Sequence, residues 1–147
     1  MLARKRRRRC PPASSADARR RMVANRGRDT SPERAIRSEL HRLGLRYRLH
    51  RRVLPEVRRQ VDIVFGPSRV AVLVDGCFWH GCPRHATQAK RNAKFWADKI
   101  ATNKRRDEDT NARLRRNGWR VVRVWEHEDP RRAAARIAKI VRARIRA

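Results

Sequence analysis

The chain has 147 residues, and its 41 Lys and Arg against 14 Asp and Glu give a formal net charge of +27. Self-repulsion of that size destabilises a compact fold unless a polyanion neutralises it, so nucleic acid is the first partner to consider, ahead of an anionic membrane surface or a ribosomal or chromatin-like packing role. No apolar run approaches the roughly 20 residues that span a bilayer, and no apolar signal segment follows the basic start, so we expect an intracellular protein whose thiols stay reduced.

The first 28 residues are strongly basic and contain the pairs Pro11-Pro12 and Ser14-Ser15. This composition predicts a disordered basic arm, with a helix over 17–25 that forms on DNA. We place the arm at 1–20, where a tether or solubility role is the simplest interpretation of its first part. A single folded domain is expected at 21–147.

The folded part is predicted to begin with a helix at Thr30, where a hydroxyl N-cap is followed by Pro32 and Glu33 in the first turn and Gly44 closes the helix. Four segments have the pattern of β-strands: 46–53, 60–65, 69–74 and 119–125. The second and third of them form a hairpin. Further helices are expected at 92–117 and 130–145. This order predicts an α/β fold with a sheet flanked by helices.

The loop after the third predicted strand is rich in metal ligands. Cys77, Cys82 and His85 have the spacing C-x4-C-x2-H, which suits tetrahedral Zn²⁺. His127 is the best remote candidate for the fourth ligand, and His80 is the local rival. Because four protein ligands would close the site, we predict a structural zinc; two buried cysteines beside a solvated histidine are the less favoured alternative.

Two aspartates lie at neighbouring strand ends. Asp62 interrupts an otherwise apolar strand, and Asp75 ends the next strand, across the hairpin. A buried, ionised carboxylate is costly unless it is paired or holds a metal ion. Mg²⁺ prefers oxygen ligands and could bind both, but pairing with some of the many arginines is an equal alternative.

His80 and the aromatic residues are the remaining candidates. An imidazole can take a proton from an attacking water at neutral pH, although His80 could also be a spare zinc ligand or a phosphate contact. Phe78-Trp79 and Phe95-Trp96 are adjacent pairs that cannot all face one core. On a basic protein such aromatics can wedge between base pairs, an interpretation that is stronger for Phe78-Trp79 than for the other pair. Two further tryptophans are predicted to lie in the core: Trp119 and Trp125.

Three separated motifs resemble the very-short-patch-repair (Vsr) endonucleases. They are DGCFWH (75–80) with an upstream strand aspartate in VDIVF (61–65), FWADKIATNKRRD…GWRVVRVWEH (95–127), and RMVANRGRDTSPE (21–33). The resemblance implies a restriction-endonuclease-like (PD-(D/E)xK-type) fold, in which a mixed central sheet is flanked by helices and a structural zinc site is added. It also implies a single mismatch endonuclease domain at 21–147.

The activity that the resemblance implies is Mg²⁺-dependent nicking of duplex DNA. One strand would be cut on the 5′ side of the thymine in a T:G mismatch that arises from deamination of 5-methylcytosine, which initiates very short patch repair. We expect a bacterial, cytoplasmic, nucleoid-associated monomer, with a mismatch-repair protein as a further potential partner. The alternatives are a restriction or resolvase-like nuclease without mismatch preference, and a non-catalytic, zinc-stabilised protein that binds distorted duplex DNA.

The family's site residues are carried over by position. Asp62 matches the metal-binding catalytic aspartate, His80 the histidine that helps to activate water, and Glu33 an acid near the metal-bound waters. The main-chain carbonyl of Val74 matches the second protein ligand of Mg²⁺. The aromatics that intercalate beside the mismatch are matched by Phe78, Trp79 and Trp96.

Two features depart from the family pattern. Asp75 stands where the best-known members have a histidine, and it supplies a second carboxylate that we expect to act in catalysis and to bind Mg²⁺. Cys77 and Cys82 match zinc-ligand positions, whereas the third ligand shifts to His85 and the fourth, a cysteine in those members, becomes His127. The predicted zinc set is therefore still a tetrahedral Cys/His set.

Overall fold

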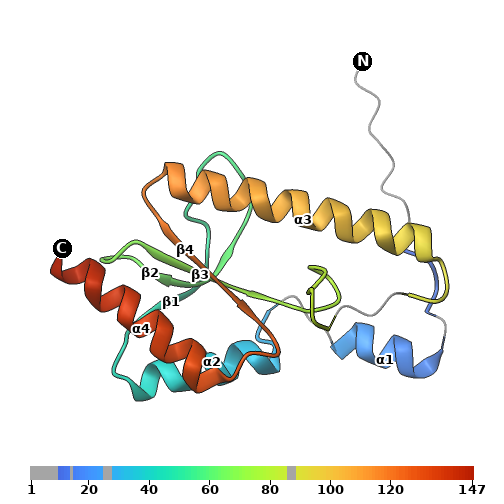
Figure 1. Ribbon diagram of the computed structural model, residues 1–147, viewed down its shortest axis with the longest axis horizontal. Helices are drawn as coiled ribbons and strands as arrows, with labels where there is room; N and C mark the ends of the chain where they lie inside the picture. Colours follow the sequence, from blue (N-terminus) through green and yellow to red (C-terminus); the bar gives the residue numbers. More distant parts are fainter. Residues whose placement is uncertain (1–9, 14, 25–27, 86–88) are drawn as a thin grey trace.

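The computed structural model describes residues 10–147 apart from residue 14 and the segments 25–27 and 86–88. Four helices and four strands follow one another within these residues (Figure 1). They are α1 (Ala16–Ala24), α2 (Ser31–Arg42), β1 (Arg48–Arg51), β2 (Val61–Phe65), β3 (Val70–Asp75), α3 (Ala93–Arg116), β4 (Arg120–Trp125) and α4 (Pro130–Arg146). The expected order from α2 to α4 is confirmed. Helix α1 crosses the expected boundary at residue 20, and residues 1–9 of the predicted arm lie outside the described residues.

The strands form one mixed sheet in the order β1-β2-β3-β4. The first three strands run antiparallel to their neighbours, whereas β3 and β4 are parallel and are joined by the crossover helix α3. This confirms the expected mixed α/β sheet flanked by helices. Helix α3 covers one face, and α2 and α4 lie together on the other (Figure 1).

Alternation of side chains along the strands produces a core on each face of the sheet. On the α2 and α4 side, Ile63 and Val72 pack with helix residues such as Ile36 and Ile137. On the α3 side, Ala71 and Leu73 pack with Leu114. Because β2 and β3 are buried from both sides, a polar residue within them must find a partner inside the protein.

The helix ends follow the predicted signals with one exception. Thr30 takes the extended N-cap conformation, but its hydroxyl does not accept the expected capping hydrogen bond. Gly44 and Gly118, which follow α2 and α3, have positive φ angles of 76° and 80°, which glycine adopts without strain. None of the helices in the described part of the chain is long and apolar enough to cross a membrane.

The two tryptophans that were predicted to be core residues behave differently. Trp119 packs against the core on the α3 side. Trp125 belongs to neither core of the described residues; it is half-buried, and its ring stacks on His127 with 6.4 Å between the centroids. The prediction for Trp125 was therefore wrong, because the strand ends beside the Cys/His loop rather than over the core.

Candidate active site and metal centres

Asp62 lies where β2 and β3 separate. Backbone pairing of the two strands covers Ile63–Phe65 and Val70–Val72, and beyond it the N–H of Val74 donates a hydrogen bond to Oδ2 of Asp62 over 2.8 Å. Burial raises the pKa of Asp62 to about 6, and the charges of Glu33 and Asp75 add to this effect against the Val74 hydrogen bond. A buried carboxylate beside two other acids is an arrangement that a divalent cation would neutralise.

The carbonyl of Val74 faces the same side as the Asp62 carboxylate. The carbonyl of Asp75 accepts a hydrogen bond from the N–H of Glu126, just past β4, over 2.9 Å. Successive residues of a strand direct their backbone groups to opposite neighbours, so the Val74 carbonyl is directed toward β2. The structure thus brings together two of the predicted oxygen ligands of Mg²⁺.

Glu33 lies in the first turn of α2 and is only 3% exposed, and its Oε1 has no hydrogen-bond partner among the described residues. This atom lies 3.3 Å from Nε2 of His50, which lies opposite Asp62 in the β1–β2 register. Asp29 completes the group, with its Oδ1 3.4 Å from the same imidazole nitrogen and 2.5 Å from Nη1 of Arg37. An orphaned, buried carboxylate oxygen implies a water or ion that satisfies it.

Asp29 and His50 were missed by the sequence analysis. Both have left-handed backbone conformations, with φ angles of 53° and 49°, which are rare for residues other than glycine and often occur at functional sites. Asp29 belongs to the RDT segment of the family-like motif, which is the one sequence signal that could have identified it. His50 gave no such signal, because it lies in a strand of alternating basic residues.

Asp75 lies on the α3 side of the sheet, with 5% of its surface exposed. Its two oxygens accept hydrogen bonds from Nη1 of Arg123, on β4, over 2.7 and 2.9 Å. Burial raises the pKa of Asp75, although the Arg123 charge opposes this effect. The structure thus shows the arginine pairing that the sequence left as an alternative, and the role of Asp75 as a Mg²⁺ ligand stays a prediction.

His80 is held by an aspartate that the sequence analysis did not single out. Its Nδ1 lies 2.5 Å from Oδ2 of Asp107 on α3, and 3.7 Å from Oδ1 of Asp75. Burial lowers the pKa of His80, but the Asp107 hydrogen bond and the charges of both aspartates outweigh this and raise it. His80 and Asp107 line a pocket of about 130 Å³, together with Arg123 and other residues. With Nδ1 engaged, Nε2 is the nitrogen that can exchange a proton with a substrate or water.

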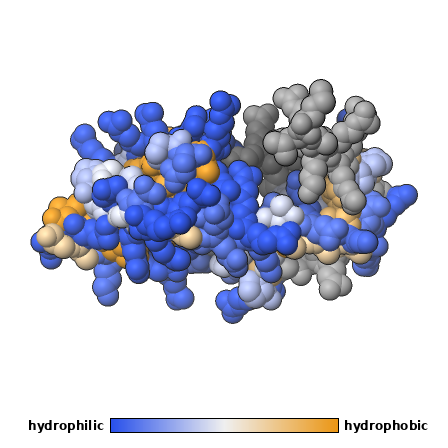
Figure 2. Space-filling view, turned by 90° about the horizontal axis from the view of Figure 1, so that it is seen from above, coloured by the Kyte–Doolittle hydropathy of each residue, from blue (hydrophilic) through white to orange (hydrophobic). Residues whose placement is uncertain are grey.

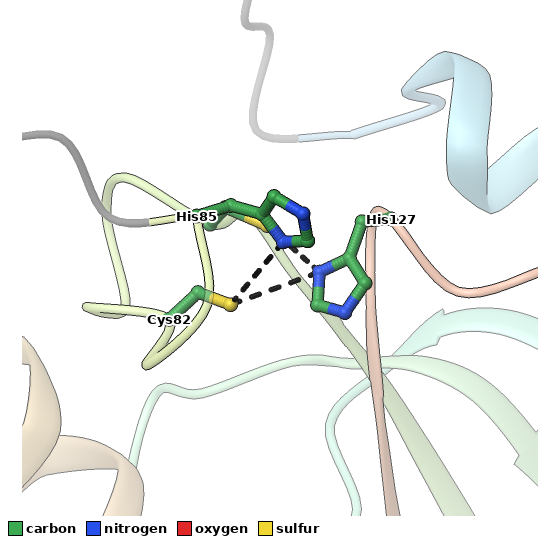
Figure 3. A group of neighbouring side chains, drawn as sticks. Cys82, His85 and His127 are labelled. Carbon is green, nitrogen blue, oxygen red and sulfur yellow. Dashed lines mark hydrogen bonds between the residues drawn. The ribbon is translucent and has the colours of Figure 1, made fainter.

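The four predicted zinc ligands meet at the end of the sheet. Nδ1 of His127 lies 3.1 Å from the sulfur of Cys77 and 3.7 Å from that of Cys82, and Nδ1 of His85 lies 4.0 Å from the Cys82 sulfur (Figure 3). All four ligand atoms lie within 4.8 Å of one another. Ligands at about 2.1–2.3 Å from a tetrahedral zinc are separated by about 3.4–3.8 Å. The donor set therefore fits zinc, and the histidine that the structure places beside Cys77, Cys82 and His85 is His127 rather than His80.

The Cys/His loop packs tightly on α3. Gly81 has a φ of 62°, and a Cβ atom there would lie 2.5 Å from Cε of Lys104 and 2.9 Å from Cγ2 of Ile100. The loop is also fixed from β4, because Oε1 of Glu126 accepts a hydrogen bond from the N–H of Cys77 over 2.9 Å. The same loop contains His80, whose Nδ1 contacts the Asp107 carboxylate.

Phe78, Trp79, Phe95 and Trp96 form one aromatic cluster. The ring centroids of Phe78 and Trp79 lie 5.4 and 5.6 Å from that of Trp96, in edge-to-face geometry, and Phe95 adds a contact at 5.2 Å. All four rings are half-buried and belong to neither core of the described residues. The three residues predicted to intercalate are thus neighbours, while their contact with DNA stays a prediction.

The comparisons with known proteins agree with this architecture. Residues 14–88 match the family model described as DNA mismatch endonuclease Vsr. A type II nicking enzyme of Lentzea aerocolonigenes, V.NaeI, is 45% identical over 129 residues, which cover 86% of this chain and 78% of that enzyme. The DNA mismatch endonuclease Vsr of Escherichia coli (strain K12) is 38% identical over 101 residues, or 67% of this chain and 62% of that protein.

A solved structure supports the nuclease fold. The catalytic domain of the homing endonuclease I-Bth0305I matches 80% of this chain and 99% of that domain with a TM-score of 0.54, at 21% sequence identity. The family model and the relatives match over a large part of the chain. The chain therefore belongs to the Vsr family of DNA mismatch endonucleases, and it is a DNA endonuclease.

Proposed function

We propose that this endonuclease nicks one strand of duplex DNA on the 5′ side of the thymine in a T:G mismatch, with Mg²⁺ as its catalytic cofactor. The observation that carries the proposal is the half-buried Asp62 carboxylate at the open end of β2 and β3, beside the Val74 carbonyl and near the buried Glu33 oxygen that has no hydrogen-bond partner among the described residues. Cutting of one strand is supported by the relative named as a nicking enzyme. T:G selectivity is supported by the family and by the aromatic cluster beside this site.

Asp62 and the Val74 carbonyl would hold Mg²⁺, with Asp75 as a further carboxylate nearby. Bound there, Mg²⁺ would stabilise negative charge on the scissile phosphate. The Glu33 oxygen would accept a hydrogen bond from a water at the site; it is buried without a hydrogen-bond partner among the described residues, although Arg37 and His50 lie within ion-pair distance. His80 would take a proton from the attacking water at Nε2 while Asp107 holds Nδ1. In-line attack then leaves a 5′-phosphate and a 3′-hydroxyl.

DNA binding follows from charge and from the aromatic cluster. The basic surplus of the whole chain would attract the phosphate backbone. Figure 2 shows that the surface on the α3 side is mainly hydrophilic, as a solvated face would be. Unstacking a base step is cheapest where pairing is already weak, as at a mismatch. Phe78, Trp79 and Trp96 would enter such a step as one group.

We propose a structural role for zinc. Cys77, Cys82, His85 and His127 would occupy all four tetrahedral positions, which leaves none for a substrate or a reactive water. The ion would join the loop after β3 to the loop after β4. It would thereby fix the loop segment that contains Trp79 and His80.

The mismatch proposal is tested by nicking of end-labelled duplexes that differ only at one base pair. We expect Mg²⁺-dependent nicking of one strand 5′ to the thymine of T:G, at least about 100-fold faster than at the matched T:A pair, a ratio within the range that positioning of a reacting group supplies. Replacing Trp79 with Ala should reduce this ratio, because the wedge is shortened. Equal rates on both duplexes would favour a nuclease without mismatch preference, and binding without nicking would favour a non-catalytic protein.

Replacing Asp107 with Asn tests whether this carboxylate positions His80. The asparagine keeps a hydrogen bond but loses the charge that raises the pKa of His80. We expect the nicking rate constant at pH 8 to fall about 10- to 100-fold and the acidic limb of its pH profile to move to lower pH, because a base of lower pKa is neutral at lower pH but accepts a proton less readily. Single-turnover nicking from pH 5.5 to 9 with saturating Mg²⁺ measures both effects.

The matched control is Glu108→Gln, at the next residue of α3, whose exposed side chain lies outside the His80 contacts. It removes one negative charge from the same helix turn and should leave the profile unchanged. If the Asp107→Asn enzyme is slower but its acidic limb does not move, Asp107 supports the fold rather than the imidazole.

A further inference from the structure

A basic groove lies between α4 and Leu43, the residue after α2. Figure 1 shows α2 and α4 on the side of the sheet opposite α3. Its volume is about 420 Å³. The groove is lined by Leu43, Ala135, Ala138, Lys139, Arg142, Ala143 and Arg146. Four of these residues are apolar (Leu43 and three alanines) and three are cations, so the lining combines small apolar side chains with positive charge.

Acidic residues balance only part of the positive charge on α4. The segment 130–147 contains seven Arg and Lys and no Asp or Glu. Neighbouring acids neutralise the start of the helix, where Glu39 lies 3.6 Å from Arg131 and Glu128 lies 3.1 Å from Arg136. Lys139 and Arg146 are exposed and have no acidic partner among the described residues. Like charges three or four positions apart destabilise a helix, and a bound polyanion removes this repulsion.

The C-terminal part of the groove lies away from the catalytic end of the sheet. Arg144, which lies between the groove residues Ala143 and Arg146, donates hydrogen bonds to the carbonyl oxygens of Ser68 and Gly118. These two residues precede β3 and β4, whereas Asp75 ends β3. The length of β3, about 17 Å at 3.3 Å per residue, therefore separates the two ends. A straight duplex seated on the catalytic end has no direct path into the groove.

We propose that the α4 groove is a second binding site for duplex DNA, which holds the phosphate backbone of a DNA segment other than the one being nicked. Lys139 and Arg146 lie on one helix face, about 10 Å apart along the axis at 1.5 Å per residue. That length of B-DNA carries about three phosphates per strand. Contacts of this kind read no sequence, and they would let one chain bridge two segments during its search for a site. The proposal rests on action on DNA, not on preference for T:G.

The test is sedimentation velocity of the full chain with two 20-base-pair duplexes that carry different dyes, one with a T:G mismatch and one fully matched. Mg²⁺ is omitted so that the first duplex stays intact. We expect a complex of one chain with both duplexes. In the double variant Lys139→Gln, Arg146→Gln the affinity for the second duplex should fall at least tenfold, and the salt dependence of log affinity should lose a slope of about 2, since two phosphate contacts are removed.

The matched control is Arg115→Gln, Arg116→Gln, which removes the same charge from exposed positions on α3 and should bind both duplexes like the unmodified chain. The nicking rate on the short T:G duplex should stay within twofold of the unmodified rate in both double variants. Because nicking and binding of the second duplex are measured separately, failure of the mismatch proposal can be distinguished from failure of the groove proposal. The proposal is overturned if the unmodified chain holds only one duplex, or if both double variants lose the second duplex equally. Capture of an acidic peptide in place of the second duplex would also overturn it.

Discussion

Replacing Asp62 with Asn is expected to abolish nicking and, in the same molecule, to stabilise the metal-free fold. The carboxylate is ionised at neutral pH although burial raises its pKa from 3.8 to about 6. Asn keeps an oxygen that accepts the Val74 hydrogen bond, and it removes the buried charge. The difference between the unfolded and folded pKa of Asp62 corresponds to about 3 kcal/mol as an upper limit. We therefore expect the free energy of unfolding of Asp62→Asn to exceed that of the wild type by about 1–3 kcal/mol at pH 7.5.

The pH dependence of this gain has a defined sign. The folded-state pKa lies above the unfolded value, so the wild-type chain has its full stability from this group below about pH 4 and loses it as the pH rises through about 6. The stability difference between the variant and the wild type should therefore be small at pH 4 and reach its maximum near pH 7. Urea unfolding in Mg²⁺-free buffer at both pH values measures it.

Activity and stability should change in opposite directions. Loss of the charged ligand should lower the Mg²⁺-dependent rate by about 10³-fold or more, within the range expected when an electrostatic contact to the transition state is removed. The control Glu108→Gln removes an exposed acid and should change neither quantity. A variant that nicks normally would show that Asp62 does not hold the metal, and an inactive variant that is less stable would show that the carboxylate is not destabilised by burial.

Loss of zinc is expected to produce the second large effect. The purified chain should carry about one equivalent of zinc, and Cys82→Ser or His127→Ala should bind less than half an equivalent. Structural zinc contributes about 10 kcal/mol or more of binding free energy in small domains, so the melting temperature should fall by more than 10 °C in these variants. The nicking rate should also fall in the zinc-deficient variants, because the same loop contains Trp79 and His80.

His80→Ala is the matched control for the zinc site. It removes an imidazole from the same loop and should retain a full equivalent of zinc, because His80 contacts Asp107 and not the ligand cluster. Cobalt substitution gives an independent readout, since thiolate-to-metal absorption bands require the cysteines. If the unchelated wild-type chain holds less than half an equivalent of zinc, or if His80→Ala loses the metal, the assignment of the four ligands is wrong.

Local patterns in the sequence were sufficient for the elements and for most of the Cys/His group that could hold a metal ion. The apolar runs of β2 and β3, the Gly-Pro-Ser turn between them and the glycine after α3 act through contacts within a few residues, so they can be interpreted without a fold. The same holds for Cys77, Cys82 and His85, which lie within one segment of nine residues. A buried aspartate within β2 was also identifiable, because its neighbours in the strand are apolar.

The partners of these residues were decided by tertiary structure alone. With 41 basic residues available, no sequence pattern could assign Arg123 to Asp75, because the two strands that bring them together are connected through the whole of α3. His127 and Asp107 are selected in the same way, by the parallel pairing of β3 with β4 and by the seating of α3 on the sheet. Sequence spacing determines which side chains can meet within one loop or helix turn. Chain folding over tens of residues determines which charges share a buried site, and a low-polarity interior makes that choice energetically decisive.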